Sequence, residues 1–208
     1  MQRMLRRWAG KRSWESRWQS TKAEGARWAW HVAEVGNEIR RNVEDGWLEP
    51  GMRVLSLGCG DGSNEAWVAG QGLTIHGMDF SKSAIARADK QYADVPGLSF
   101  SVVDVTKPRA HHAEPYDVVL DRGCLHEIAP ELGRMYAANV KRWTKPGGSL
   151  ILIMRLEGDA TGQRRLQQID DLLGADFKLV DWDNITVGGE HGEHGETIDG
   201  GMFRLKKR

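Results

Sequence analysis

The sequence has few of the features that would place it in a membrane, outside the cell or on a nucleic acid. Only two cysteines occur among 208 residues, too few for a disulfide framework, so a reducing cytoplasm is the expected location. No apolar run reaches the roughly 20 residues needed to cross a bilayer, and the basic segment 1–12 lacks the apolar core of a secretory signal. The 29 basic residues balance 29 acidic ones, so no excess charge favours a nucleic-acid partner.

Length and composition are those of one domain with a hydrophobic core. Hydrophobic residues make up 40% of the chain and charged residues 28%, and no internal repeat is visible. The segment 1–22 differs from the rest because it is basic and carries three of the nine tryptophans. We therefore expect an N-terminal arm over 1–22 and a single domain over 23–208. We expect the protein to be a monomer or a weak dimer.

The role of the arm has more than one interpretation. It could be a partly ordered segment whose indoles pack on the domain. Alternatively it could be a lid, because Trp14 and Trp18 are one helical turn apart and could close together over a pocket. A basic, aromatic arm could also bind RNA, but the rest of the chain gives that interpretation no support.

The most informative stretch is a short apolar run that ends in three alternating glycines, Gly58, Gly60 and Gly62. The run predicts a buried parallel strand, and the glycines predict a tight turn that lets a ligand approach the backbone. A second strand is expected from Leu73 to Met78, followed by Asp79. An acid at that distance from the turn can accept hydrogen bonds from both hydroxyls of a ribose.

These residues resemble the class I S-adenosylmethionine-dependent methyltransferases. The segment 57–62 resembles their first motif, and 77–81 resembles the end of their second strand. The sequence departs from the family at Ser56, where Asp or Glu usually helps to hold the methionine amino group, and Ser56 offers a hydroxyl instead. The resemblance implies S-adenosylmethionine as the cofactor, without a metal, and a cofactor site at Trp18, Ser56, Gly58, Cys59, Gly60, Asp79, Phe80, Asp104, Val105 and Asp121.

Two further stretches extend this resemblance. The strand 98–103 ends in Asp104 and Val105, which in the family flank the adenine ring, although Asp104 could equally be an ordinary strand-end carboxylate. The string from Asp121 to His126 resembles the thiopurine S-methyltransferase-like and tellurite-resistance methyltransferases, which act on small, soft nucleophiles. The segment 14–18 resembles the tryptophan-containing stretch that borders cofactor and substrate in the thiopurine group. The resemblance covers roughly residues 14–156.

The remaining patterns complete an α/β fold with a doubly wound, mostly parallel seven-stranded sheet and an antiparallel last strand, the Rossmann-like methyltransferase fold. Helices are expected at 28–43, 65–70, after Ser81, at 130–143 with Leu132 facing inward, and at 160–173. Residues 145–148 should form a turn before a strand at 149–154. Strands at 177–187 and 197–206 should form a closing hairpin.

The candidate catalytic residues at the ligand edge are Asp121, Arg122, His126 and Arg155. Methyl transfer mainly requires alignment and exclusion of water. A thiol ionises at a pKa of about 8.5 and needs no strong base, whereas an alcohol does. Arg122 or Arg155 could favour a thiolate, and His126 could take a proton. However, Asp121 could merely orient the methionine end, and His126 could be bonded to backbone.

Three functions remain open at this point. The first is a small-molecule S-methyltransferase, the second an N- or O-methyltransferase of a metabolite, and the third a cofactor-binding protein without turnover, which Ser56 favours. The pair His111 and His112 is expected at the surface, and the loop with His191 and His194 is expected to be solvated, so no metal site is predicted. Cys59 and Cys124 are expected to be buried reduced thiols.

Overall fold

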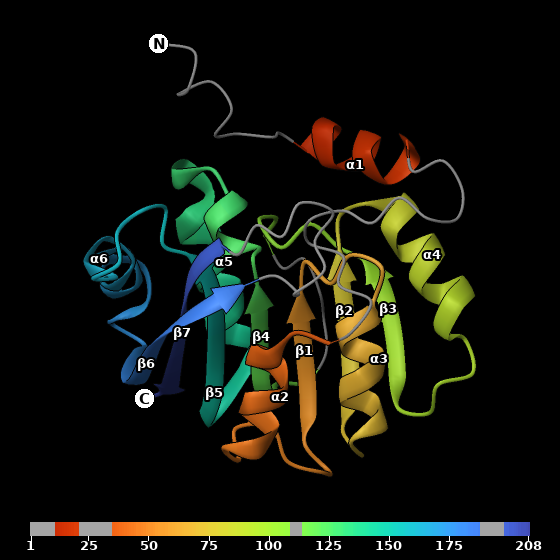
Figure 1. The fold of residues 1–208 in the computed structure, drawn as a ribbon, viewed down its shortest axis with the longest axis horizontal. Coiled ribbons are helices and arrows are strands. Elements are labelled where there is room, and N and C mark those ends of the chain that lie inside the picture. Colours follow the sequence, from red (N-terminus) through yellow and green to blue (C-terminus); the bar gives the residue numbers. More distant parts are fainter. Residues whose placement is uncertain (1–10, 21–34, 109–113, 188–197) are drawn as a thin grey trace.

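A computed structural model describes residues 11–20, 35–108, 114–187 and 198–208 (Figure 1). Its centre is a seven-stranded sheet in the order β3-β2-β1-β4-β5-β7-β6. All neighbouring strands pair in parallel except β7, which is antiparallel to both β5 and β6. The predicted fold class is therefore confirmed. The strands are β1 (Arg53–Leu57), β2 (Thr74–Asp79), β3 (Leu98–Val102), β4 (Tyr116–Arg122), β5 (Thr144–Arg155), β6 (Phe177–Val187) and β7 (Ile198–Lys207).

Side chains of the central strands alternate between two hydrophobic clusters, one on each face of the sheet. On β5, Leu150 and Leu152 belong to the first cluster, whereas Ile151 and Ile153 belong to the second. This alternation follows from the pleat of a strand that is buried on both faces. The described helices are α1 (Lys11–Ser20), α2 (Asn37–Glu44), α3 (Ser63–Gly70), α4 (Lys82–Tyr92), α5 (Gly133–Trp143) and α6 (Gln163–Leu173), with the 3₁₀ turns η1 (Leu125–Glu127) and η2 (Pro130–Leu132).

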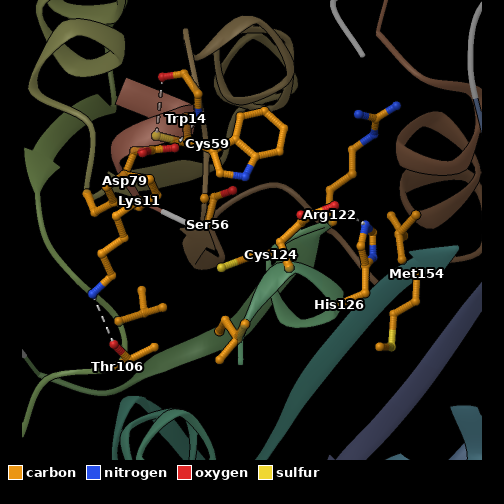
Figure 2. A pocket seen from close by; sticks show the side chains of 18 of the residues that line it. Lys11, Trp14, Ser56, Cys59, Asp79, Thr106, Arg122, Cys124, His126 and Met154 are labelled. Atoms are coloured by element: carbon orange, nitrogen blue, oxygen red, sulfur yellow. Dashed lines mark hydrogen bonds and ion pairs between the residues drawn. The ribbon is translucent and has the colours of Figure 1, made fainter. Parts of the chain in front are cut away.

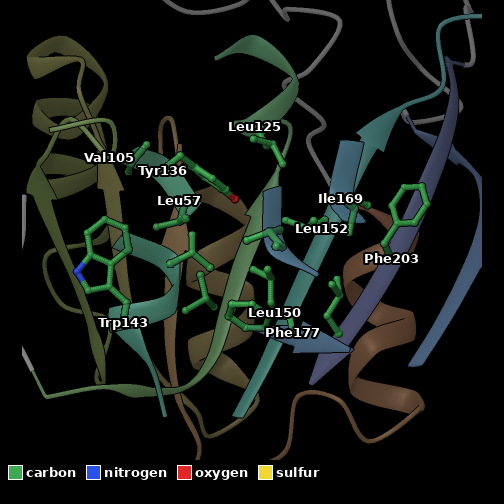
Figure 3. Close-up of a cluster of buried hydrophobic side chains, with 14 of the residues drawn as sticks. Leu57, Val105, Leu125, Tyr136, Trp143, Leu150, Leu152, Ile169, Phe177 and Phe203 are labelled. Carbon is green, nitrogen blue, oxygen red and sulfur yellow. The ribbon is translucent and has the colours of Figure 1, made fainter. Parts of the chain in front are cut away.

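The helices α5 and α6 supply one wall of the first cluster. Tyr136 and Trp143 of α5 are fully buried there, together with Ile169 of α6 and Phe203 of β7 (Figure 3). The second cluster lies under α2 and α3 and includes Ile39. Both clusters leave the carboxyl ends of β1, β2, β4 and β5 free of covering helices except α1, which lies above that edge (Figure 1).

Two predicted boundaries differ from the structure. The expected turn at 145–148 lies inside β5, where pairing passes from Tyr116↔Thr144 to Val118↔Ser149, so β5 carries an irregularity instead of starting after a turn. The expected helix from Pro130 starts as the 3₁₀ turn η2, and α5 begins at Gly133. Because Leu132 precedes the α-helix, the helical spacing does not apply to it, and it is 37% exposed instead of facing inward.

Some predictions lie outside the described residues. These are the N-terminal part of the helix expected at 28–43, the histidine pair at 111–112 and the loop at 188–196. Within the described part of that helix, Ile39 is buried and Val35 and Val43 pack against the same cluster, as the apolar stripe predicts. None of the helices described here is long and apolar enough to span a membrane.

Candidate active site

A cavity of about 840 Å³ opens at the carboxyl edge of the sheet. It is lined by residues that follow β1, β2 and β3, by the end of β4 and the turn after it, and by α1 from above. The chain order in the sheet reverses at β1, whose neighbours are β2 and β4. Open α/β sheets bind their ligands at such a switch point, and the volume is in the range of small-molecule sites.

The glycine turn forms one wall of this cavity. Gly58 and Gly60 have φ angles of +68° and +58°, in the left-handed region that favours glycine. A Cβ atom on Gly58 would lie 2.9 Å from the Cβ of Cys124, and one on Gly60 would lie 3.0 Å from the indole of Trp18. The turn is also tied to β2, because the amides of Gly58 and Cys59 both donate to the carbonyl oxygen of Met78. Glycine is therefore required here both by the backbone and by the narrow space.

Asp79 lies at the end of β2, beside this turn. Its Oδ2 accepts from the amide of Gly60 at 3.0 Å and its Oδ1 from the amide of Ser81 at 2.8 Å. The side chain lines the cavity while the residue is only 8% exposed, and this burial raises the pKa of the carboxyl. The two amides fix the direction of the carboxylate, which leaves lone pairs for ligand hydroxyls.

Sequence reasoning missed Glu65, a buried acid in the first turn of α3. The hydroxyl of Ser56 donates to Glu65 Oε1 at 2.6 Å, and both residues line the cavity. Burial raises the pKa of Glu65 to about 7. Its Oε2 has no hydrogen-bond partner among the described residues. The only signal in the sequence was an acid close after a strand that lacks the family's usual acid.

Helix α1, the described part of the arm, lies against the cavity. Trp14 and Trp18 both line it, and Trp18 is 7% exposed. The helix is attached to α4, because Glu15 accepts from the hydroxyl of Ser83 at 2.7 Å and Arg87 donates to the carbonyl oxygen of Trp18 at 2.8 Å. The predicted proximity of the two indoles to the pocket is thus present in the structure, and whether α1 opens and closes stays a prediction.

The residues expected near an adenine ring are at the other side of the cavity. Asp104 and Val105 both line it. The carboxylate of Asp104 forms an ion pair with Lys11 of α1 and accepts from the hydroxyl of Thr106 at 2.6 Å. Figure 2 shows Lys11 reaching from α1 toward Thr106. The sequence gave no indication that Lys11 would contact this corner.

Asp121 is brought to the ligand edge but turns away from the cavity. It is fully buried and accepts from the amide of Cys124 at 2.8 Å, from the amide of Leu125 at 3.0 Å and from the hydroxyl of Tyr136 at 2.6 Å. Burial raises its pKa to about 6. These contacts assign Asp121 the task of holding the turn after β4, and its predicted roles as a catalytic and a cofactor-binding residue gain no support from the geometry.

Three other candidate residues lie together near η1. Arg122 lines the cavity, but its Nε donates to Glu38 Oε1 at 2.6 Å. The ring of His126 is buried, and its Nδ1 accepts weakly from the amide of Arg155 at 3.4 Å. Burial and the nearby arginines lower the pKa of His126 to about 3, so the imidazole is neutral near pH 7 and a weak base. Figure 2 shows Arg122 and His126 on the same side of the cavity.

Arg155 is the least restrained of these cations. Its closest acidic partner is Glu127, with Nη1 and Oε1 3.9 Å apart, and its side chain is 40% exposed. The cavity near it is lined mainly by apolar side chains. They are Ile128, Ala129, Pro130, Leu132, Ile153, Met154, Val187 and Ile198.

The two cysteines are free thiols that line the cavity. Burial and the neighbouring carboxylates raise the pKa of both Cys59 and Cys124 well above the usual value. The prediction of buried reduced thiols agrees with this arrangement. Among residues 11–20, 35–108, 114–187 and 198–208, no group of three or more His, Cys, Asp or Glu side chains could hold a metal ion.

Comparison with known proteins decides the family. The sequence matches the thiopurine S-methyltransferase family over residues 9–187. The chain belongs to this family. The predicted membership of the class I S-adenosylmethionine-dependent methyltransferases is thereby confirmed.

Individual relatives are more distant. A probable thiol methyltransferase of Arabidopsis thaliana is 30% identical over 142 residues, 68% of this chain and 60% of that protein. A thiopurine S-methyltransferase of Pseudomonas aeruginosa is 22% identical over 203 residues, 81% of this chain and 90% of that protein. The match therefore spans less than two thirds of the Arabidopsis protein.

Solved structures show the same fold. One protein, studied for the conversion of a disulfide bond into a thioacetal group during echinomycin biosynthesis, has a TM-score of 0.77 and 22% identity, with 95% of this chain and 93% of that one covered. An S-adenosylmethionine-dependent methyltransferase from Anabaena variabilis also has a TM-score of 0.77, at 15% identity over 94% of this chain and 93% of that one.

Proposed function

We propose that this protein transfers a methyl group from S-adenosylmethionine to a small molecule. The observation that carries the proposal is the cavity at the switch point, with the narrow glycine turn and the fixed Asp79 on its wall. Gly58, Cys59 and Gly60 would face the cofactor, Asp79 would accept from its ribose, and Phe80 and Val105 would border its base. The cofactor supplies an electrophilic methyl group on a sulfonium.

The protein's own contribution is alignment and exclusion of water. The apolar side chains near Met154 form one wall, and Trp14 and Trp18 form the roof. Holding the acceptor atom in line with the methyl group can supply on the order of 7–11 kcal/mol without a covalent intermediate. A dry cavity also prevents water from competing as the nucleophile.

Replacing Asp79 with alanine should weaken S-adenosylmethionine binding by about 1.5–3 kcal/mol, the range for hydrogen bonds to a charged group. Titration calorimetry measures the loss directly. Asp89→Ala, which removes an exposed carboxylate from α4, is the matched control and should bind like the wild type. Equal affinity of the Asp79→Ala variant would remove Asp79 from the ribose site.

The acceptor we propose is a small, largely apolar thiol or a related chalcogen compound. The acceptor side of the cavity offers no strong base, because His126 has a pKa of about 3 and Asp121 does not line the cavity. A thiol needs no such base, since a few per cent is already ionised near pH 7. The Arabidopsis relative named a probable thiol methyltransferase supports the same choice.

The rate with a thiol should rise with pH through the pKa of the bound thiol. Protonation removes the thiolate nucleophile, so activity is lost as the pH falls below that pKa, and no inflection should appear near 6.5 because His126 is already neutral there. Arg155→Gln should shift the midpoint upward, because the apolar wall raises the pKa of the thiol and the arginine opposes that rise. Initial rates measured from pH 6 to 10 would test both points.

Lys141→Gln is the control for this profile, because it also removes one positive charge but does not line the cavity. A flat profile with thiols, together with faster methylation of an amine or phenol, would replace the thiol assignment by an N- or O-methyltransferase. Binding of S-adenosylmethionine without release of S-adenosylhomocysteine from any of a panel of thiols, amines and phenols would identify a binding protein without turnover.

A further inference from the structure

The cofactor site has an unusual division of labour between Ser56 and Glu65. At the end of β1, where related enzymes usually carry an acid, Ser56 is 2% exposed and offers only a hydroxyl. That hydroxyl donates to Glu65 Oε1 at 2.6 Å. A carboxylate is therefore present at this end of the cavity, but it comes from α3 instead of β1.

Glu65 is not satisfied by the residues around it. It is 3% exposed, it lines the cavity, and its Oε2 has no hydrogen-bond partner among the described residues. A buried carboxylate with an unused oxygen costs free energy unless a cation or a donor reaches it. Arg122 is the cation that acts on it electrostatically, but the Nε of Arg122 bonds to Glu38.

We propose that Glu65 binds the ammonium group of the methionine part of S-adenosylmethionine, and that Ser56 positions its carboxylate by donating to Oε1. The hydroxyl and the carboxylate have exchanged places between strand and helix, so that the charge partner of the ammonium is kept although β1 lacks the acid. This proposal rests on the proposed cofactor. It makes Glu65 a cofactor-binding residue and Ser56 a positioning residue.

A proton should leave the site when the ammonium binds. Burial and Asp61 raise the pKa of Glu65, whereas Ser56 and Arg122 lower it, and the result is about 7. At pH 7 about half of the Glu65 side chains therefore carry a proton in the empty site. A bound ammonium favours the ionised form, so binding should displace about half a proton per site from this group.

Two ligands separate the role of Glu65 in binding from a role in folding. S-adenosylhomocysteine carries the ammonium, whereas 5′-deoxy-5′-methylthioadenosine has the adenosine and the sulfur but no amino-acid part. Glu65→Gln should weaken S-adenosylhomocysteine binding by about 10- to 100-fold, the value of a hydrogen bond to a charged group, and leave methylthioadenosine affinity unchanged. Unchanged affinity for S-adenosylhomocysteine, or an equal loss for both ligands, would overturn the proposal.

The double variant Ser56→Asp, Glu65→Ser tests the exchange itself. It returns the acid to β1 and places the hydroxyl on α3, so it should recover most of the affinity for S-adenosylhomocysteine that Glu65→Gln loses. Failure to recover, in a variant that still binds methylthioadenosine, would contradict the exchange.

The wild-type protein provides a test that needs no variant. Calorimetry at pH 7 in buffers of different ionisation enthalpy should show that S-adenosylhomocysteine releases about half a proton more than methylthioadenosine does. Equal proton release by the two ligands would overturn the role of Glu65 even if every variant failed to fold. If the wild type binds neither ligand, the proposed cofactor itself is wrong, which is a different result from binding that ignores Glu65.

Discussion

Replacing Arg122 with alanine should lower the free energy of unfolding by about 3–5 kcal/mol, the loss typical of a buried ion pair that loses one partner. The Nε of Arg122 lies 2.6 Å from Oε1 of Glu38, and the side chains are 15% and 2% exposed. Without the arginine, the Glu38 carboxylate would stay buried with no charge to offset it. The pair joins α2 to the end of β4, so its loss should loosen the wall of the cavity as well.

Urea denaturation followed by circular dichroism would measure this effect. The double variant Arg122→Met, Glu38→Leu should recover most of the stability, because a well-packed apolar pair removes the uncompensated charge. Lys145→Ala is the control at the surface. Its partner Asp117 is 2.7 Å away but both side chains are about a third or more exposed, so the loss should stay below about 1 kcal/mol. A similarly small loss for Arg122→Ala would contradict the structural role of the pair.

This arrangement also decides which arginine can report on the acceptor. A variant of Arg122 would change the stability of the protein and the position of Glu38 together, so a loss of activity would not identify a charge effect on the acceptor. Arg155 has only a long contact of 3.9 Å with Glu127 and is 40% exposed. Its substitution changes the charge beside the cavity with less effect on packing, which makes it the better choice for the pH profile.

The parts of the fold that sequence reasoning predicted are those with a strong local pattern. The strand at 116–122 is a run of apolar residues, and the positive φ angles of Gly58 and Gly60 follow from a turn that other residues could not form. The hairpin strand at 177–187 was predicted with the bounds of β6. Turn 145–148 was less predictable, because the way a strand absorbs extra residues depends on the neighbouring strand.

The parts of the site that could not be predicted depend on contacts between distant residues. Asp121 was expected to face the ligand, but two backbone amides and the hydroxyl of Tyr136 draw its carboxylate into the protein. His126 was expected to be able to take a proton, but its burial beside arginines lowers its pKa to about 3. Neither effect is visible in the residue type, because each is produced by the tertiary surroundings.

Deleting residues 1–22 should lower kcat/KM by about 100-fold, the size of effect that imperfect positioning of reactants produces. Helix α1 carries the indoles of Trp14 and Trp18 into the roof of the cavity and the ammonium of Lys11 to Asp104. Removing it would admit water to the reacting groups and leave Gly60 without the indole that packs on it. We expect both a higher KM and a lower kcat.

The sheet and its two clusters should survive the deletion, because the buried residues of both clusters lie outside α1. The double variant Trp14→Ala, Trp18→Ala should therefore reproduce most of the loss of activity in the full-length chain. Gln19→Ala changes an exposed side chain of the same helix, whose hydrogen bond is to Glu15 of α1, and should keep normal activity. Full activity of the deletion variant on a small thiol, with an unchanged unfolding transition, would make the arm dispensable for catalysis; loss of the folded state would make it part of the core.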